Sequence, residues 1–266
     1  MAQTESTPHL SYSVSGDPNA PFIVFVNGLG GAQAAFIHQV RHFSKQRQVL
    51  TYDHRGIGKS DVVDSSAHMA DFASDLIRLL DELHIDRADF VGLSFGGRVL
   101  LQLAAGWPER VRKLVVGGTS AGGHLHEPGD GDTHRTLRAA RGGTEEDWAR
   151  HIAPLLFGRK YCEQYPDRLL SLARWKSRYP TNPVGLDRQW EAWDSFDLGD
   201  QLSEIECPVL VLHGTDDRLS PTGNADRLTA HLPNATAHFM EGIGHSPNVE
   251  DPAGFNAAID RFLQNS

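Results

Sequence analysis

Cysteine is scarce in this sequence, and its scarcity excludes two kinds of architecture. Only Cys162 and Cys207 occur among 266 residues. Two thiols are too few for the disulfide framework of a small secreted protein, and their spacing does not match a metal-ligand motif. We therefore expect a protein of the reducing cytoplasm whose fold does not depend on disulfides.

Long hydrophobic runs and an excess of positive charge are also missing. No segment approaches the roughly 20 apolar residues that a transmembrane helix needs, and the N-terminus lacks the basic and apolar regions of a secretory signal. Lys and Arg number 25 against 34 Asp and Glu, which gives a formal net charge of −9. Nucleic-acid and anionic-membrane surfaces are disfavoured on this ground, and we expect a soluble intracellular protein.

The composition that remains is that of an ordinary globular domain. Hydrophobic residues make up 39% of the chain and charged residues 22%, so wholesale disorder is not expected. A chain of 266 residues can bury a large core and form one α/β domain, with room for an inserted subdomain.

Short apolar runs alternate with amphipathic stretches through most of the chain. The runs are rich in β-branched and aromatic residues, which is typical of strands buried on both faces. They lie at residues 22–26, 49–52, 90–93, 111–116 and 208–212, and a further strand is expected near residues 236–240. Residues 10–15 alternate apolar and polar and predict an edge strand, whereas residues 69–84 have the spacing of an amphipathic helix. This rhythm predicts an α/β fold with a doubly wound, mostly parallel sheet.

The alternation of predicted strands and helices stops near residue 121 and resumes near residue 199. The segment between holds helix-like stretches at 144–157, 162–179 and 184–196 and four of the chain's five tryptophans. Such an insertion predicts a helical cap over an apolar pocket. We expect residues 1–120 and 199–266 to form the α/β core and residues 121–198 to form the cap. The candidate pocket residues are Trp148, Trp175, Trp190 and Trp193.

Three histidines in the cap segment raise the question of a metal site. His124, His126 and His134 have no partner cluster with them that would complete a ligand motif. We therefore interpret them as parts of a solvated loop and predict no metal.

Residues 89–98 read D-F-V-G-L-S-F-G-G-R and carry a candidate nucleophile. Ser94 follows an apolar strand and has Gly92 and Gly96 two residues to either side, which is the spacing of a sharp strand-to-helix turn. We expect side chains at the two glycine positions to collide with the strained backbone of the serine. The Phe95 amide, at the helix start, would then face the charge that develops on an attacked carbonyl. Taken alone, the five-residue pattern fits a structural turn equally well.

A second glycine-rich loop, N-G-L-G-G at residues 27–31, follows the strand at 22–26. Its glycines let the backbone approach a ligand closely, and we expect the Leu29 amide to be a second oxyanion donor. A plain flexible connection is the alternative. The loop is not a dinucleotide fingerprint, because the third glycine of G-x-G-x-x-G is missing.

The run G-K-S at residues 58–60 resembles the end of a phosphate loop. The first glycine of that motif would fall at Asp53, so a nucleotide site is rejected. We predict instead a tightly hydrogen-bonded turn in which Asp53 and Arg55 are structural, and no organic cofactor is implied.

Two later loops supply what Ser94 needs as a nucleophile. A serine hydroxyl is unreactive at neutral pH without an imidazole base and a carboxylate to orient that base. Residues 213–221, H-G-T-D-D-R-L-S-P, offer Asp216 and Asp217, and residues 242–247, G-I-G-H-S-P, offer His245. Each loop follows a predicted strand, and the order serine, acid, histidine predicts a catalytic triad at the carboxyl edge of the sheet.

With these motifs the chain resembles the α/β-hydrolase family over nearly its whole length. It is most similar to 3-oxoadipate enol-lactonases and related small esterases, through Y-D-H-R-G-I-G-K-S-D, G-L-S-F-G-G followed by W-P-E-R-V-R-K-L-V, and H-S-P-N-V-E-D-P. The acid loop of that family commonly reads G-x-x-D-x-x-x-P. Gly214, Asp217 and Pro221 match it, so Asp217 is preferred to Asp216. Phe95 stands where methionine is frequent, and residues 122–197 show no match, so the substrate does not carry over.

The triad and the resemblance together predict a serine hydrolase that cleaves a small carboxylic ester or lactone through an acyl-enzyme, without a cofactor. A serine nucleophile disfavours the haloalkane dehalogenases and epoxide hydrolases of the same fold, which attack with aspartate. Alternatives on the same triad are a carbon-carbon bond hydrolase, which Ser246 makes less favoured because tryptophan is often found there, and a cofactor-free perhydrolase. A ligand-binding receptor is a further alternative, although a binder has no need of all three residues. The expected partner is a small molecule, and oligomeric state is left open.

Overall fold

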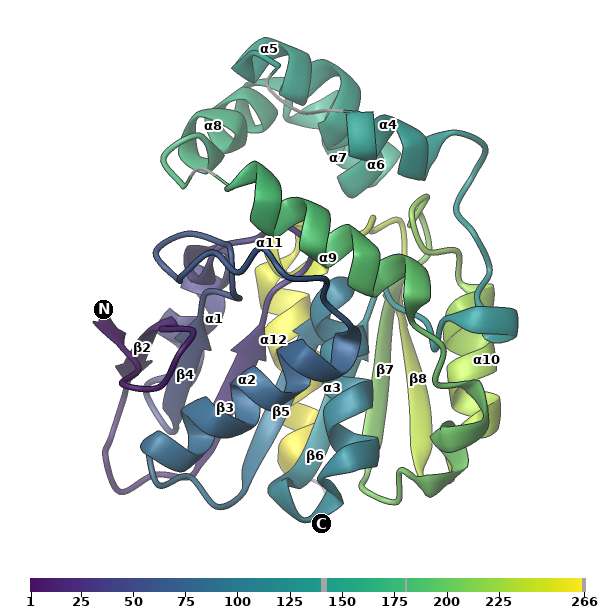
Figure 1. Ribbon diagram of the computed structural model, residues 1–266. Helices are drawn as coiled ribbons and strands as arrows, with labels where there is room; N and C mark the ends of the chain where they lie inside the picture. Colours follow the sequence, from purple (N-terminus) through teal and green to yellow (C-terminus); the bar gives the residue numbers. More distant parts are fainter. Residues whose placement is uncertain (140–142, 180, 265–266) are drawn as a thin grey trace.

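Eight strands form one sheet in the computed structural model, which describes residues 1–139, 143–179 and 181–264. Their order is β1-β2-β4-β3-β5-β6-β7-β8 (Figure 1). Their bounds are β1 Ala2–Gln3, β2 Ser11–Ser15, β3 Phe22–Val26, β4 Gln48–Tyr52, β5 Ala88–Leu93, β6 Val111–Gly117, β7 Val209–Gly214 and β8 Ala235–Met240. The six strands from β4 to β8 in this order pair in parallel, whereas β2 is antiparallel to β1 and β4. The predicted doubly wound, mostly parallel sheet is confirmed.

The strand predicted at residues 10–15 does not lie at the edge of the sheet. It forms β2, and β1 covers its outer side by pairing Ala2 with Tyr12 and Gln3 with Ser11. The prediction of an edge strand is therefore wrong. A two-residue strand such as β1 is too short for any periodic pattern to indicate it.

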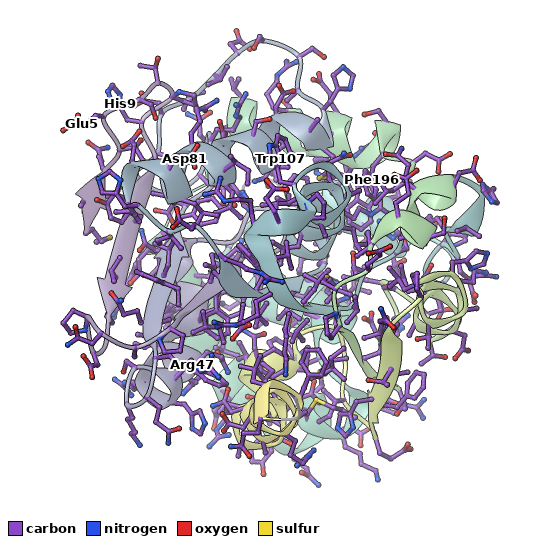
Figure 2. All side chains as sticks on the ribbon, turned by 90° about the horizontal axis from the view of Figure 1, so that it is seen from below. Glu5, His9, Arg47, Asp81, Trp107 and Phe196 are labelled. Carbon is purple, nitrogen blue, oxygen red and sulfur yellow. The ribbon has the colours of Figure 1, made fainter. Side chains whose placement is uncertain are left out.

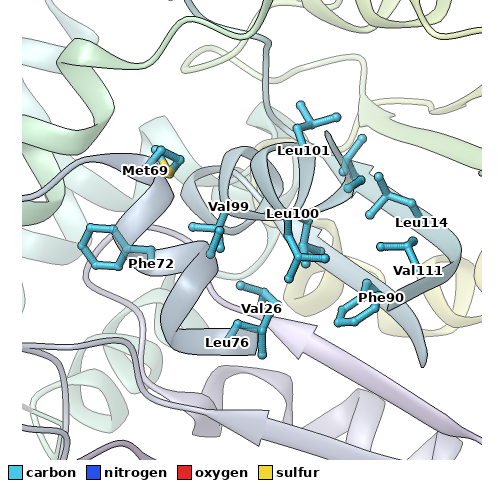
Figure 3. Packing of buried hydrophobic residues seen from close by; sticks show 14 of the residues in the cluster. Val26, Met69, Phe72, Leu76, Phe90, Val99, Leu100, Leu101, Val111 and Leu114 are labelled. Carbon is cyan, nitrogen blue, oxygen red and sulfur yellow. The ribbon is translucent and has the colours of Figure 1, made fainter. Parts of the chain in front are cut away.

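Helices cover both faces of the sheet because side chains alternate along each strand. In β3, Ile23 and Phe25 face one side and Val24 and Val26 the other, and all four are fully buried. The first side packs against α1 and α12 and the second against α2, α3 and α10; Figure 3 shows α2 and α3 over the second side. The helix bounds are α1 Ile37–Phe43, α2 Met69–Glu82, α3 Phe95–Gly106, α10 Gly223–His231, α11 Pro247–Glu250 and α12 Pro252–Gln264. None of the described helices has both the length and the apolar character to span a bilayer.

The turn after β4 is tightly hydrogen-bonded, as predicted. Oδ1 of the buried Asp53 accepts the Gln33 amide at 2.7 Å, and its Oδ2 accepts the Lys59 amide at 3.3 Å. Arg55 donates from two nitrogens to the buried carboxylate of Asp75, at 2.5 and 2.6 Å. These contacts give Asp53 and Arg55 structural roles and confirm the prediction for both.

The amino ends of the strands are held by a separate ion-pair group, far from this turn. Asp89 at the start of β5 is buried and accepts from Arg47 at 2.6 Å and from Arg112 at 2.7 Å. Figure 2 views the molecule from this end and labels Arg47. Two guanidinium partners offset the cost of burying the Asp89 carboxylate. We therefore interpret these ion pairs at the amino ends of the strands as structural.

Two of the three helical stretches predicted in the cap segment are divided by prolines, whereas the third, predicted at 184–196, is confirmed as α9 Pro183–Ser195. The stretch at 144–157 divides into α5 Glu145–Asp147, a π-helical turn Trp148–Ile152 and α6 Ala153–Leu156, because Pro154 lacks the amide hydrogen that a regular helix needs. A second proline, Pro166, begins a new helix and divides the stretch at 162–179. The remaining helices are α4 Thr133–Ala139, α7 Arg159–Gln164, α8 Pro166–Lys176 and α9 Pro183–Ser195.

These helices lie above the carboxyl ends of the parallel strands, with α9 crossing nearest to the sheet (Figure 1). They have a small apolar core of their own, formed by Ala153, Phe157, Tyr161 and Leu169. Residues 140–142 and 180 of the predicted cap, and 265–266 of the predicted core, lie outside the described residues. The division of the chain into core and cap remains a prediction.

Candidate active site

Ser94 stands at a sharp corner between β5 and α3. Its backbone has φ 54° and ψ −118°, a conformation that side chains disfavour. Hydrogen bonds from the end of β6 and the loop after it hold this corner: the Ser94 amide donates to the Gly117 carbonyl at 2.8 Å, and Thr119 Oγ1 donates to the Ser94 carbonyl at 2.8 Å. These hydrogen bonds hold the strained backbone of Ser94 in place, because a strained conformation persists only where the surrounding structure fixes it.

Gly92 and Gly96 exclude a side chain for a different reason from the one expected. A Cβ on Gly92 would lie 2.5 Å from the Gly96 carbonyl oxygen, and a Cβ on Gly96 would lie 2.2 Å from the Val26 carbonyl oxygen. The collisions are thus not with the serine itself. Gly96 lets the start of α3 pack directly on the end of β3, which brings Ser94 beside the loop at residues 27–31.

Asp217 is the acid that reaches the histidine. Its Oδ2 accepts His245 Nδ1–H at 2.8 Å, and its Oδ1 accepts the amides of Leu219 and Ser220 at 2.9 Å each. The carboxylate is fully buried. The side chain of Asp216 instead accepts the Arg159 amide at 3.4 Å, so of the two candidates the structure brings Asp217 to His245.

His245 rests on the end of β6, which also holds the serine. Gly118 has a φ of +55°, and a Cβ there would lie 3.1 Å from both Nδ1 and Cε1 of the His245 ring. The preceding residue is Gly117, whose carbonyl accepts the Ser94 amide. Because Nδ1 carries the proton given to Asp217, Nε2 is left as the basic nitrogen.

A second histidine stands beside the acid, and sequence reasoning missed it. His213 is fully buried, and its Nε2 donates to the Ser220 carbonyl at 2.6 Å while lying 3.6 Å from Asp217 Oδ2. Burial lowers the pKa of His213, which favours the neutral ring. Since its proton is given to a carbonyl, His213 does not compete with His245 for Asp217. The only sequence signal was its position at the start of the acid loop.

The loop at residues 27–31 runs beside the nucleophile. A Cβ on Gly28 would lie 3.4 Å from Ser94 Cβ and 4.0 Å from Ser94 Oγ. The Gly30 amide donates to Gln189 Oε1 at 2.7 Å, and Thr181 Oγ1 donates to the Gly30 carbonyl at 3.1 Å. The Leu29 amide has no acceptor among the described residues. A free backbone donor next to the serine is compatible with the predicted oxyanion role.

His54 joins this loop to the nucleophile helix, which the sequence did not indicate. Its Nε2 donates to the Asn27 carbonyl at 3.1 Å, and its ring lies edge-on to Phe95 with centroids 5.5 Å apart. Burial lowers the pKa of His54 to about 4, so the ring is neutral at pH 7. Phe95 is buried against it, and its amide is the first of α3, which has no acceptor within the helix.

The four predicted pocket tryptophans do not form one group. Trp190 and Trp193 of α9 lie together, with centroids 6.5 Å apart, and contact His134. Trp148 packs instead against the small apolar core of the cap segment, and Trp175 contacts Tyr179. Only the α9 pair therefore shares a location, and the pocket role of all four remains a prediction.

Two of the three loop histidines are not solvated as expected. His126 and His134 are half-buried with rings 6.2 Å apart, and both contact Trp193. His124 alone is exposed. The prediction of a solvated loop is wrong for His126 and His134, because α9 covers both from a distant part of the sequence and His134 lies in α4 rather than in a loop.

A pocket of about 650 Å³ opens beside the acid loop. Its walls are residues 215–218 on one side and Pro154, Phe157, Arg159 and Cys162 from the helical segment on the other. None of the four tryptophans lines it. The pocket therefore lies on the side of α6 and α7 rather than of α9, and Asp217, the predicted acid, is among the residues that line it.

Comparisons with known proteins agree with the observed fold. The family model of the alpha/beta hydrolase fold matches residues 21–252. A protein of Caulobacter sp. (strain K31) described as a carbamate hydrolase, RutD, is 32% identical over 275 residues, covering 98% of each chain. The 3-oxoadipate enol-lactonase 2 of Acinetobacter baylyi is 29% identical over 255 residues, covering 96% of this chain and 93% of that protein.

Among solved structures, the enol-lactonase from Burkholderia xenovorans LB400 is similar, with a TM-score of 0.86 and 28% sequence identity. The match covers 99% of this chain and 100% of that one. The structural similarity therefore extends through residues 122–197, where the motifs alone had shown none.

Proposed function

The chain belongs to the α/β-hydrolase family, as its motifs predicted, and we propose that it hydrolyses small carboxylic esters or lactones through Ser94, His245 and Asp217. Family and relatives together make it a hydrolase of ester-type bonds. The observation that carries the triad is the bond of 2.8 Å between two buried side chains, His245 Nδ1 and Asp217 Oδ2, 28 residues apart. A serine on a strained corner beside the same strand end supplies the third member.

The proposed reaction proceeds through an acyl-enzyme. His245 Nε2 takes the proton from Ser94 Oγ as the oxygen attacks the carbonyl carbon, and Asp217 stabilises the imidazolium through its bond to Nδ1–H. The amides of Leu29 and Phe95 donate to the oxyanion. The protonated ring then gives its proton to the leaving oxygen, which departs as the alcohol or as the freed hydroxyl of an opened lactone.

Water completes the cycle. His245 Nε2 takes a proton from a water molecule as that water attacks the acyl carbonyl, and the tetrahedral intermediate releases Ser94 with its proton restored. One ester bond and one water are consumed, and one acid and one hydroxyl group are formed. No step requires a group beyond the side chains and amides named.

Hydrolysis of 4-nitrophenyl butyrate by the wild-type protein and by Ser94→Ala tests the proposal. Loss of the nucleophile should lower kcat/KM by at least about a thousandfold. Ser220→Ala is the matched control, because it keeps the backbone amide that Asp217 accepts, and it should stay within a few-fold of wild type. Full activity in Ser94→Ala would rule out this nucleophile.

Carbamate hydrolysis is a second candidate, favoured by the relative at 32% identity that is described as a carbamate hydrolase. Ser94 of the same triad can attack the carbonyl carbon of a carbamate, which acylates the serine and releases an amine or an alcohol. An aryl carbamate assayed beside the aryl ester and a series of lactones would rank the substrates by kcat/KM. A ring-fission dienone and a peracid assay in the same panel would separate the carbon-carbon hydrolase and perhydrolase alternatives.

A further inference from the structure

One carboxylate oxygen joins the loop of His245 to a distant part of the chain. Oε2 of Glu250, at the end of α11, accepts the Gly244 amide at 2.9 Å and the Gly158 amide at 3.0 Å. Gly244 directly precedes His245, whereas Gly158 comes between α6 and α7. A single acceptor therefore fixes the loop of the proposed base against the helical segment.

The two stretches of backbone meet so closely at this point that no side chain fits between them. A Cβ on Gly244 would lie 2.5 Å from the Phe157 carbonyl carbon, and a Cβ on Gly158 would lie 2.2 Å from the Gly242 carbonyl oxygen. Gly158 and Gly244 are both buried. Because a buried amide without an acceptor is unfavourable, the contact between the two stretches depends on the oxygen of Glu250 that accepts from both.

The residue after His245 is held by the same turn between α6 and α7. The Ser246 amide donates to the Leu156 carbonyl at 2.9 Å. Both neighbours of His245 are thus anchored to this turn, one directly and one through Glu250. The bond to Asp217 fixes only Nδ1 of the imidazole, so the direction in which Nε2 points also depends on where the backbone of the loop is held.

The surroundings of Glu250 favour its contacts more than its charge. Burial raises the pKa of Glu250, and the nearby carboxylates of Asp216 and Asp251 act in the same direction. Both amides donate to one oxygen, so an uncharged side chain of the same length can accept both of them. What Glu250 contributes to the loop is therefore an acceptor at a fixed place.

We propose that Glu250 is a positioning residue for His245, which directs Nε2 toward Ser94 by holding the histidine loop against the turn between α6 and α7. The inference rests on the proposed function, because it takes His245 as the base of that reaction. Phe157 and Arg159, on either side of Gly158, line the pocket beside the acid loop. The same contact therefore connects a wall of this pocket to the proposed base.

Two substitutions of Glu250 separate its contacts from its charge. Glu250→Gln keeps the length and an oxygen for both amides but removes the charge, whereas Glu250→Asp keeps the charge and is one methylene shorter. With 4-nitrophenyl butyrate, Glu250→Gln should keep kcat within about threefold of wild type. Glu250→Asp should lower kcat at least about tenfold with a smaller change in KM, because a small displacement of the base slows the chemical step rather than binding.

Glu241→Gln and Glu241→Asp are the matched controls, because Glu241 is exposed in the same loop, and both should keep the wild-type kcat. An unchanged kcat in Glu250→Asp would overturn the inference. A loss in Glu250→Gln as large as that in Glu250→Asp would overturn it too, since the charge would then be responsible. If Glu250→Asp does not fold, Glu250→Gln still decides: a fall in its kcat of more than about tenfold at an unchanged Tm refutes positioning by contact alone.

Hydrogen exchange followed by mass spectrometry gives a readout without turnover. Peptides that cover residues 156–158 and 242–247 should exchange at least about tenfold faster in Glu250→Asp than in the wild type, and at the wild-type rate in Glu250→Gln. Equal exchange in all three proteins would show that Glu250 does not hold the loop. If Ser94→Ala keeps full activity, the proposed function fails, and exchange alone then decides whether Glu250 fixes His245 in place.

Discussion

Asp217→Asn tests the proposed role of Asp217 in orienting His245. The substitution changes which nitrogen of the imidazole carries the proton and leaves the other groups of the site in place. Asp217 Oδ1 accepts two backbone amides at 2.9 Å, and these amides can only donate. An asparagine must therefore keep its oxygen there and turn its NH₂ group toward His245. Nδ1 then has to accept, the ring proton moves to Nε2, and the imidazole can no longer take a proton from Ser94.

The size of the effect follows from these contacts. The active tautomer loses a hydrogen bond to a charged group, worth about 1.5–3 kcal/mol, and leaves two donors facing each other, at about 1–3 kcal/mol. The sum is roughly 2.5–6 kcal/mol. At about 1.36 kcal/mol for each factor of ten, kcat/KM should fall roughly a hundredfold to ten-thousandfold.

The assay is kcat/KM for one 4-nitrophenyl ester at pH 7.5, with thermal unfolding to verify that each variant is folded. Asp216→Asn is the control, because the one hydrogen bond of its carboxylate to the described residues is a 3.4 Å contact with the Arg159 amide, and it should stay within about threefold of wild type. More than a tenth of wild-type activity in Asp217→Asn, or a larger loss in Asp216→Asn, would refute the reasoning.

Gly96→Ala should lower Tm strongly or prevent folding, because its Cβ would lie 2.2 Å from a carbonyl oxygen of β3, whereas Gly106→Ala on the same helix has nothing within 4 Å and should leave Tm unchanged or higher; equal melting temperatures would contradict this. Gln189→Leu should lower kcat about tenfold or more with a smaller change in KM, because the Gly30 amide of the oxyanion loop loses its buried acceptor; an unaltered kcat would show that the loop does not need α9. Urea unfolding should show stability decreasing as the pH falls from about 6.5 to 4, because burial lowers the pKa of His54 to about 4 and the unfolded chain takes up the proton first; a flat profile would argue against a neutral buried ring.

The sequence was sufficient to predict that the three proposed triad residues lie at the carboxyl ends of strands. Ser94 comes directly after a predicted strand, and Asp217 and His245 lie in the loops that follow two others; parallel strands bring their carboxyl ends to one edge. The contact between His245 and Asp217 therefore needed only the correct strand assignment. The choice between Asp216 and Asp217 needed the family motif, since the two differ by one position in the same loop.

Contacts made across the sequence could not be predicted in this way. Gly96 was expected to avoid a collision with the backbone of Ser94, but the atom that a Cβ there would meet is a β3 carbonyl oxygen 70 residues earlier in the chain. His126 was expected in solvent, and Trp193 of α9 covers it. In each case the deciding neighbour comes from an element whose position depends on packing rather than on local pattern.

The positive φ of Ser94 also determines which substitution would remove the proposed hydrolase activity at no cost in stability. Any residue with a side chain is strained in that conformation by about 1–3 kcal/mol, whereas glycine adopts it freely. Ser94→Gly would thus remove the nucleophile and relieve the strain in one substitution, and the inactive chain should melt higher than wild type, while Ser94→Ala keeps the strain. Selection for abundance alone would favour that dead variant. The serine at this corner thus costs folding free energy, and the proposed role in turnover would explain why the position is not glycine.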